Sequence, residues 1–378
     1  MRAATSTLYF LTLFYNVVKS GIDRSAPPAP VPHERMSPVA AVRLSDVAAR
    51  AGVSVKTVSN VVHGYVHVRE ETRSRVQAAL DELGYRPNLS ARSLRQGRSG
   101  LVALAVPALD VPYFAELASA VVAAATELGW TVLVDQTDGD ADREREVAAG
   151  LRGHLIDGLI LSPVALGAAD LRRTEKDVPL VLIGERISDG AIDHVAIDNV
   201  AASRAATEHL IGLGRTRVAA IGFQGADHAR SGVAALRRRG YEEALAAAGL
   251  GTGTAWTPEV ARYTRAEGAG AVDALLSDEV PDAVFAFNDE LALGALHALA
   301  RHGLRVPDDV AVIGFDDIED GRFSIPTLST VRPDKAALAR RAVELLQKRI
   351  AEPDAPNDDV EVPFELVVRE STVGAPVA

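Results

Sequence analysis

Few polar side chains in this sequence are spaced for covalent chemistry. Asp316 and Asp317 form a carboxylate pair, but neighbouring residues at the end of a strand point to opposite faces. There is no cysteine, and after residue 100 no Ser/His/Asp, metal-ligand or phosphate-loop spacing recurs. We therefore expect no catalytic residue, no metal ligand and no cofactor.

Recognition of nucleic-acid bases is a second kind of chemistry, and a stretch near the N-terminus suits it. Lys56 can donate to guanine O6 and N7, Asn60 can pair with adenine, and Val55 can touch a thymine methyl group. The alternative for these side chains is a solvated helix face. Other polar groups nearby suit phosphate oxygens, which position a protein without specifying sequence; they belong to Ser54, Thr57, Ser59 and His67.

The elements that must position these side chains are short helices around a glycine turn. Apolar residues at helical spacing predict two helices, formed by Leu44, Val47, Ala48 and Ala51 and then by Val55, Val58, Val61 and Val62. Gly52 lies at the turn, where a Cβ is disfavoured, and Ser54 is expected as the N-cap of the second helix. A third helix over Glu71–Leu83 completes a small core. This order predicts a helix-turn-helix domain whose second helix enters the major groove.

The order of residues within Val42–Leu94 is more specific than this outline. The motifs D-V-A-x-x-A-G-V-S-x-x-T-V-S-x-V-V, T-R-x-R-V and G-Y-x-P-N closely resemble the headpiece of the lactose-repressor/galactose-repressor (LacI/GalR) family. A looser resemblance extends to about Glu370. The resemblance implies that Val55, Lys56 and Asn60 read bases of double-stranded, pseudopalindromic operator DNA.

Three residues depart from the family's pattern. His63 stands where relatives commonly have Asn, and Arg43 and Arg69 stand where relatives usually have Thr or Ser as helix N-caps. Arginine cannot accept a backbone N–H, and its charge opposes the positive end of the helix dipole. Contact with a DNA phosphate and neutral drift are both open explanations for the two arginines.

Residues 87–98 are expected to connect the headpiece to the rest of the chain. The segment Pro87–Arg95 has the pattern of a short amphipathic helix, which is marginal in water by itself, so a flexible linker is the expectation for the free protein. The resemblance implies a hinge helix that orders on DNA, with Leu94 wedged into a minor-groove step, Ala91 beside it and Arg92 near the backbone.

The formal net charge of −11 looks unsuited to DNA until it is divided along the chain. Residues 42–98 carry +5, residues 1–41 carry +2, and the remainder carries −18. A basic headpiece on an acidic body concentrates the attraction for DNA at one end.

Residues 1–39 are expected to lie outside the fold. Leu8–Val18 is an apolar run that is too short to span a bilayer, and a poor signal-peptide cleavage site follows it. Met36 is a candidate start, so the alternatives are a mis-assigned start codon and a disordered tail. We expect no membrane segment and, in a chain without cysteine, a cytoplasmic, nucleoid-associated protein.

From Leu101 onward, buried strands alternate with helices, which predicts parallel βαβ units. Two such sets in series predict an α/β core of two doubly wound parallel-sheet subdomains with a ligand cleft between them. The arrangement resembles the type I periplasmic-binding-protein fold that serves as the core of this family. The expected boundaries are 40–86 for the headpiece, 99–198 with 329–352 for the first subdomain, 199–328 with 353–370 for the second, and 371–378 for a tail.

The resemblance implies a small-molecule effector in this cleft. An aromatic face with Asp, Asn and Arg fits a sugar or a similar polyol, and a nucleobase would use the same groups differently. The residues implied are Tyr113, Phe114, Arg237, Tyr263, Asn288 and Asp316.

These features predict a transcriptional repressor that is controlled by a sugar-like effector. There are two alternatives. The core considered by itself also fits a periplasmic-type sugar-binding protein, and the whole chain also fits a repressor that needs a nucleobase-type corepressor. We expect a homodimer and no tetramer, because no heptad tail follows the core. Leu293 and its neighbours on the helix Glu290–Ala300 are the expected contact in the second subdomain, with intramolecular core as the alternative.

Overall fold

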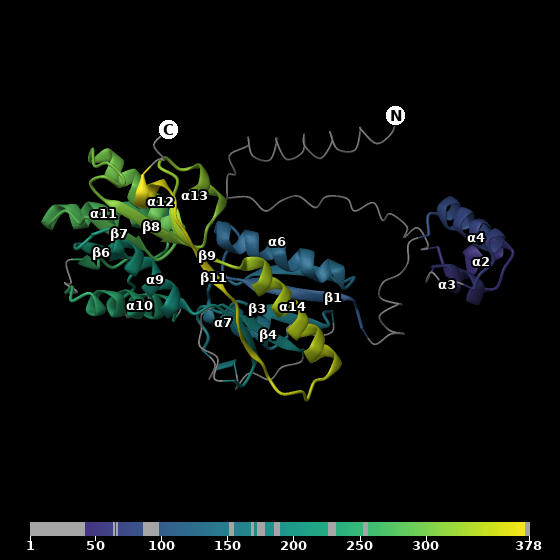
Figure 1. Ribbon diagram of the computed structural model, residues 1–378. Helices are drawn as coiled ribbons and strands as arrows, with labels where there is room; N and C mark the ends of the chain where they lie inside the picture. The colour runs from purple at the N-terminus through teal and green to yellow at the C-terminus, as the bar shows by residue number, and fades with distance from the viewer. Residues whose placement is uncertain are drawn as a thin grey trace, which may run out of the picture. The chain divides into compact units, whose positions relative to one another are not determined.

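The computed structural model divides into two compact units, one up to Pro87 and one from Asn88 (Figure 1). The residues that it describes are 42–62, 65, 67–85, 98–150, 155–167, 170–171, 178–184, 190–225, 232–251 and 256–374. The predicted extension over 1–39 and most of the predicted hinge lie outside these residues. So do four of the residues named above, which are His63, Ala91, Arg92 and Leu94.

Three helices form the first unit, and they are α2 (Leu44–Ala51), α3 (Val55–Val62) and α4 (Glu70–Leu83). Gly52 between the first two has φ 66°, the left-handed conformation that the predicted turn requires. The helices bury one small core, made of Val47, Ala48, Ala51, Val58, Val61, Val76, Ala79 and Leu80. The helical spacing predicts Val55 in this core as well, but Val55, the first residue of α3, is 47% exposed.

Polar groups at the helix starts explain where the helices begin. The Ser54 hydroxyl accepts the Thr57 backbone N–H at 3.1 Å, which is the geometry expected of an N-cap. At the start of α2, the Asp46 carboxylate accepts the Arg43 backbone N–H at 2.8 Å, whereas the Arg43 side chain makes no capping hydrogen bond. The Arg69 side chain also makes none at the start of α4. Both arginines therefore leave their helices without a side-chain cap.

Replacing Arg69 with serine is expected to stabilise α4 by about 1 kcal/mol, because a serine hydroxyl can accept an N–H of the first helical turn. Hydrogen exchange of the α4 amides in the full chain should then slow by about fivefold. Arg75→Ser, at an exposed position inside the same helix, is the control and should not slow exchange. Unchanged exchange in Arg69→Ser would contradict the capping argument. The salt dependence of operator binding gives a second result. If the slope of the logarithm of the binding constant against the logarithm of salt concentration becomes shallower by about one unit per half-site in Arg69→Ser, Arg69 contacts a phosphate.

The second unit contains two sheets. In the first sheet, neighbouring strands are parallel and lie in the order β10-β5-β4-β3-β1-β2. The strands are β1 (Leu101–Val106), β2 (Thr131–Gln136), β3 (Gly158–Leu161), β4 (Leu180–Ile183), β5 (Asp193–Ala196) and β10 (Asp359–Glu361). The central strands β3 and β4 are buried along their whole length, which explains their continuously apolar sequences.

The second sheet has the order β11-β9-β8-β7-β6, and all its strand pairs are parallel except β11 with β9. Its strands are β6 (Val218–Ile221), β7 (Ala283–Ala286), β8 (Ala311–Phe315), β9 (Ser329–Pro333) and β11 (Phe364–Val367). The fold class predicted from the alternation of strands and helices is therefore confirmed. We call the parts of the core built on the two sheets the first half and the second half.

Helices pack against both sheets (Figure 1). In the first half α6 packs on α14, and in the second half α9 packs on α10 and α11 packs on α12. The helices of the core are α6 (Pro112–Glu127), α7 (Ala141–Ala148), α9 (Asn199–Gly212), α10 (Val233–Ala247), α11 (Arg265–Asp278), α12 (Asp289–Arg301), α13 (Glu319–Phe323), α14 (Lys335–Ala351) and α15 (Glu370–Val373). Among the described residues, no helix combines the length and the apolar content needed to cross a bilayer.

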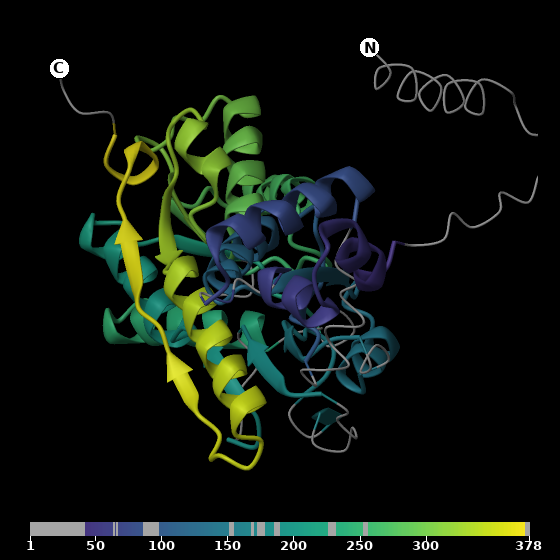
Figure 2. The same ribbon diagram turned by 90° about the vertical axis from the view of Figure 1, so that its right-hand side faces the viewer.

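The C-terminal segment differs from the predicted division of the core. The segment predicted for the first subdomain, 329–352, includes β9, which lies in the second sheet between β8 and β11. The segment 353–370, predicted wholly for the second subdomain, contributes β10 to the first sheet and β11 to the second, and Figure 2 shows these strands one after the other. Residues 371–373 are not a tail, because Ser371 is buried and donates to the Val312 carbonyl at 2.6 Å.

The helix α12 carries the residues predicted to contact a second copy of the chain, and most of its apolar face belongs to the core of the second half. Its apolar side chains pack against α11 and the second sheet, and Leu293 is itself half-buried against the core. Leu293 keeps part of its surface exposed, so its contact with a second copy stays a prediction. The most exposed large apolar side chains described in the second half are Phe323, 77% exposed, and Ile325, 96% exposed.

Candidate effector site and DNA-recognition helix

A pocket of about 590 Å³ lies between the two halves of the core. From the first half it is lined by residues that follow β1 and begin α6, among them Tyr113 and Phe114. From the second half it is lined by residues that follow β7 and β8, by α10 and by the segment before α11. The structure brings all six predicted effector residues to this one pocket, and they are Tyr113, Phe114, Arg237, Tyr263, Asn288 and Asp316.

Arg237 is the most constrained of these side chains, with 3% of its surface exposed. Its Nε donates to Asn199 Oδ1 at 2.9 Å, and one terminal nitrogen donates to the Phe287 carbonyl. The other terminal nitrogen lies 3.9 Å from Asp316 Oδ1, and the guanidinium stacks 3.5 Å from the centre of the Phe315 ring. The planar guanidinium is therefore held in one orientation before any ligand arrives.

Asn288 and Tyr263 each use one polar atom to hold the pocket together. Asn288 Oδ1 accepts the Leu291 backbone N–H at 2.9 Å and caps α12, so its amide nitrogen is the group that can donate to a ligand. The Tyr263 hydroxyl donates to the Gly222 carbonyl at 2.9 Å. Tyr113 and Phe114 contact each other edge to face, with ring centres 5.2 Å apart. The pocket thus combines fixed aromatic faces with oriented polar groups.

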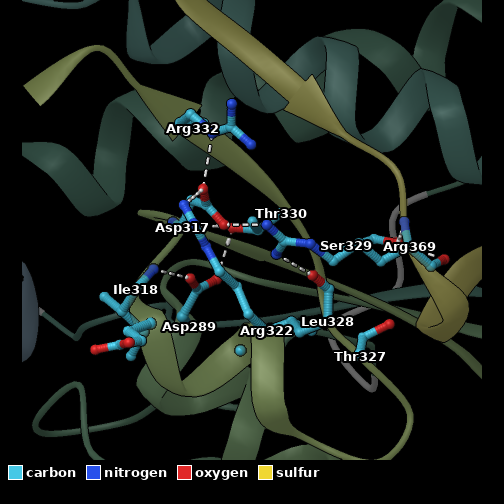
Figure 3. A network of polar contacts seen from close by, with 12 residues as sticks. Asp289, Asp317, Ile318, Arg322, Thr327, Leu328, Ser329, Thr330, Arg332 and Arg369 are labelled. Atoms are coloured by element: carbon cyan, nitrogen blue, oxygen red, sulfur yellow. Dashed lines mark hydrogen bonds and ion pairs between the residues drawn. The ribbon is translucent and has the colours of Figure 1, made fainter.

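The two neighbouring carboxylates at the end of β8 serve different sites, as the alternation of side chains predicts. Asp316 has φ 113° and lines the pocket. Asp317 has φ 47° and meets three guanidinium groups away from it, those of Arg322, Arg332 and Arg369, at 2.9, 2.7 and 2.6 Å (Figure 3). Both φ values are rare outside glycine, and such backbone strain is often found at functional sites.

Burial and charge act in opposite directions on Asp317. Burial by itself would raise the pKa of its carboxyl group, but hydrogen bonds from Arg369 and Arg332 outweigh burial and hold this pKa below its ordinary value. Asp317 is therefore a carboxylate at neutral pH, and it offsets part of the positive charge of three arginines that come from α13, β9 and the segment after β11.

Asp289 is a functional-site neighbour that the sequence did not reveal. It is fully buried beside Asn288, and it accepts the Thr330 hydroxyl at 2.7 Å and the Ile318 backbone N–H at 2.9 Å (Figure 3). Burial, and then the nearby charge of Asp316, raise the pKa of the Asp289 carboxyl well above its ordinary value. An acidic residue in the first turn of a helix usually indicates only a favourable helix dipole, so no local signal marks it.

In the first unit, the predicted base-reading residues lie on α3. Val55 and Lys56 are exposed and Asn60 is half-buried, and the helical spacing places Lys56 and Asn60 opposite the buried Val58 and Val61. This face of α3 is therefore available to a partner of the first unit.

The residues predicted to contact phosphates lie at the start of α3, within it and beyond its end. Ser54 and Thr57 at its start share a hydrogen bond of 2.9 Å between their hydroxyl oxygens. Ser59 is half-buried within α3, and His67, beyond its end, contacts the Tyr65 ring edge to face at 5.4 Å.

Both units match known protein families. Residues 43–88 match the model of the lacI family of bacterial regulatory proteins, and residues 207–372 match the model of a periplasmic binding protein-like domain. The chain is 32% identical to the HTH-type transcriptional repressor PurR of Mannheimia succiniciproducens over 331 residues, which are 87% of this chain and 98% of the relative.

Solved structures give the same result. The chain is similar to a transcriptional regulator of LacI family from Sanguibacter keddieii, with 46% identity over 74% of this chain and all of that one and a TM-score of 0.67. It is also similar to the transcriptional regulator CelR in complex with cellobiose, with 31% identity over 87% and 99% of the two chains and a TM-score of 0.65. A third similar structure is the lac repressor dimer bound to operator and the anti-inducer ONPF, with 28% identity, 88% and 100% coverage and a TM-score of 0.78. The chain therefore belongs to the lacI family of bacterial regulatory proteins, and it is a DNA-binding transcriptional regulator.

Proposed function

We propose that the chain is a homodimeric repressor whose affinity for pseudopalindromic operator DNA is controlled by a sugar-like effector in the core pocket. The observation that carries this proposal is the pocket itself, which gathers three aromatic rings and three polar side chains from both halves of the core. The similarity to a lac repressor dimer bound to operator and to a CelR–cellobiose complex supports it. Because the operator is genomic DNA, we place the protein in the cytoplasm with the nucleoid.

The chemistry of the pocket favours a sugar. Tyr113, Phe114 and Tyr263 offer ring faces for the C–H groups of a sugar ring. Asp316 can accept from neighbouring hydroxyl groups, and the Asn288 amide and the Arg237 guanidinium can donate to them. A planar nucleobase would stack on the same rings and pair with the same polar groups. No catalytic step is part of the proposed function.

A thermal-shift screen of the full chain against monosaccharides, disaccharides, nucleosides and nucleobases tests the effector class. A ligand that binds only the folded state raises the unfolding midpoint through a stabilisation of RT ln(1 + [L]/Kd). We expect a sugar to raise the midpoint and to change binding of the chain to a duplex that it has selected from a random pool. A response to nucleobases alone would contradict the sugar assignment, and failure to select any duplex would contradict the regulator.

Lys56→Ala is expected to weaken binding to the selected duplex by about 1–3 kcal/mol, because a bidentate contact to guanine is lost. Affinity for random DNA of the same length should fall much less, since phosphate contacts supply most of non-specific binding. The measurement is a pair of titrations at one salt concentration. Equal losses on both DNAs would show that Lys56 contacts only phosphate.

For the dimer, we propose a contact through the exposed pair Phe323 and Ile325, beside the predicted contact at Leu293 on α12. A second copy of the chain is the partner that would cover these side chains, since each exposes most of its apolar surface. Sedimentation of Ile325→Asp tests this contact, and a dimer as stable as the parent's would rule it out.

A further inference from the structure

One ammonium group joins the effector pocket to the first half of the core. Lys335, the first residue of α14, donates from Nζ to the carbonyl oxygens of Asp316 and Asp317 at 2.7 and 3.2 Å. The same nitrogen forms an ion pair with Glu116 of α6, and it lies 5.7 Å from the centre of the Tyr113 ring. Only 15% of the Lys335 side chain is exposed, so water competes weakly for these contacts.

Glu116 holds the second half through a further contact. Its Oε1 accepts the Glu319 backbone N–H at 3.2 Å, while its other oxygen pairs with Lys335. Glu319 begins α13, which directly follows the Asp316–Asp317 turn. Two side chains of the first half therefore bind three polar groups of the second half's backbone within residues 316–319, two carbonyls and one amide.

The elements involved also carry the pocket. Tyr113 and Glu116 lie three residues apart and hence on the same side of α6, and Asp316 contributes both a side chain to the pocket and a carbonyl to Lys335. A ligand that contacts Tyr113 and Asp316 would draw α6 and the Asp316–Asp317 turn together. The hydrogen bonds of Glu116 and Lys335 hold the first half to the same turn and to the residue that begins α13. Moving the halves apart must break the three hydrogen bonds that Lys335 and Glu116 make to the second half, whereas the Glu116–Lys335 ion pair lies wholly within the first half and can persist.

We propose that Glu116 and Lys335 form a grip through which the first half holds the Asp316–Asp317 turn, and that this grip sets the balance between arrangements of the two halves. The consequence for operator affinity rests on the proposed function above. In that setting the two residues are positioning residues, because they act through the turn and the helix that line the pocket. Loosening the grip changes the population of the arrangement that binds effector, and with it the apparent affinity.

The absence of cysteine from the sequence makes a direct test simple. Spin labels on cysteines introduced at Leu128, 38% exposed at the end of α6, and Leu213, 41% exposed at the end of α9, report the distance between the halves. Labelled chain is diluted with excess unlabelled chain, so that only distances within one chain are measured. Neither effector nor DNA is needed.

Lys335→Met is expected to raise the population of a second distance by about tenfold relative to the parent. Glu116→Gln should act in the same direction but more weakly, since glutamine can still accept the Glu319 N–H. The matched control is Lys348→Met on the same helix, because Lys348 pairs with Asp358 at 2.6 Å beside the first sheet and should leave the distances unchanged.

Identical distance distributions in the parent and in folded Lys335→Met would overturn the grip, and Glu116→Gln decides the question if Lys335→Met fails to fold. Titration with the selected duplex is the second arm. Operator affinity of ligand-free Lys335→Met should differ from the parent's by at least about threefold, with no change in Lys348→Met. If the distances change but operator affinity does not, Glu116 and Lys335 hold the two halves together but have no part in regulation. A parent chain that binds no duplex would reject the proposed function alone, because the distance measurement stands without it.

Discussion

Asp317→Asn is expected to lower the free energy of unfolding of the core by roughly 2–3 kcal/mol at neutral pH. The Asp317 carboxylate is 1% exposed and accepts from three guanidinium groups, so asparagine leaves like charges facing one another. The loss stays below that of a fully buried network because the Arg322 and Arg332 side chains are 54% and 38% exposed and water can solvate them. Denaturant unfolding of the two proteins measures the difference.

The pH dependence of this difference has a definite sign. The folded-state pKa of Asp317 lies below its ordinary value of 3.8, so its ionised form contributes stability that is present above that value and lost as the pH falls through the folded-state pKa. The stability gap between the parent and Asp317→Asn should therefore narrow in acid. A gap that is constant from neutral pH down to about 2 would show that charge is not what stabilises the cluster.

Asp289→Asn is the matched control, because Asp289 is an equally buried carboxyl of the same network (Figure 3). Its folded-state pKa is raised, so the stability that its protonated form contributes is lost as the pH rises from 3.8 through the folded-state value. The Asp289→Asn protein should accordingly gain stability relative to the parent as the pH rises, opposite to the trend for Asp317→Asn.

Arg237→Lys is expected to weaken effector binding by about 100-fold, or roughly 3 kcal/mol. Lysine keeps the positive charge near Asp316 but cannot donate at once to Asn199, to the Phe287 carbonyl and to a ligand. Besides lining the pocket, Arg237 joins α10 to the start of α9 and to the residue after β7. Arg237→Ala would therefore confound binding with stability, since it also removes the hydrogen bonds to Asn199 and to the Phe287 carbonyl.

The measurement is a titration of the selected duplex with and without the sugar found in the thermal-shift screen. Operator affinity without sugar should be unchanged in Arg237→Lys, while the sugar response should require about 100-fold more ligand. Arg238→Lys is the control, because Arg238 is 57% exposed and pairs with Glu242 on the surface of the same helix. A wild-type sugar response in Arg237→Lys would show that the effector binds elsewhere.

The helix-turn-helix unit could be predicted almost completely from the sequence. Its determinants are local: apolar residues three and four apart place Val47, Val58 and Val76 in one core, Gly52 permits a left-handed turn, and Ser54 caps α3. The family resemblance named six residues that line the pocket. Strand ends account for Tyr113, Asn288 and Asp316, which follow β1, β7 and β8 at the carboxyl edges of the sheets. Arg237 comes from α10 and Tyr263 from the segment before α11, and no strand pattern points to them.

The tertiary structure alone decided which distant residues meet. Asp317 is paired with Arg369, and Lys335 with Glu116, across long stretches of sequence that carry no shared pattern. The short strands β10 and β11 have no periodicity strong enough to choose a sheet, so only the crossing of the chain assigns one to each half. The sequence also could not show what covers the apolar face of α12, because such a face packs in the same way against its own core or against a second copy. Local spacing determines which face of an element is apolar, whereas the partner of that face depends on contacts that form only when the whole chain has folded.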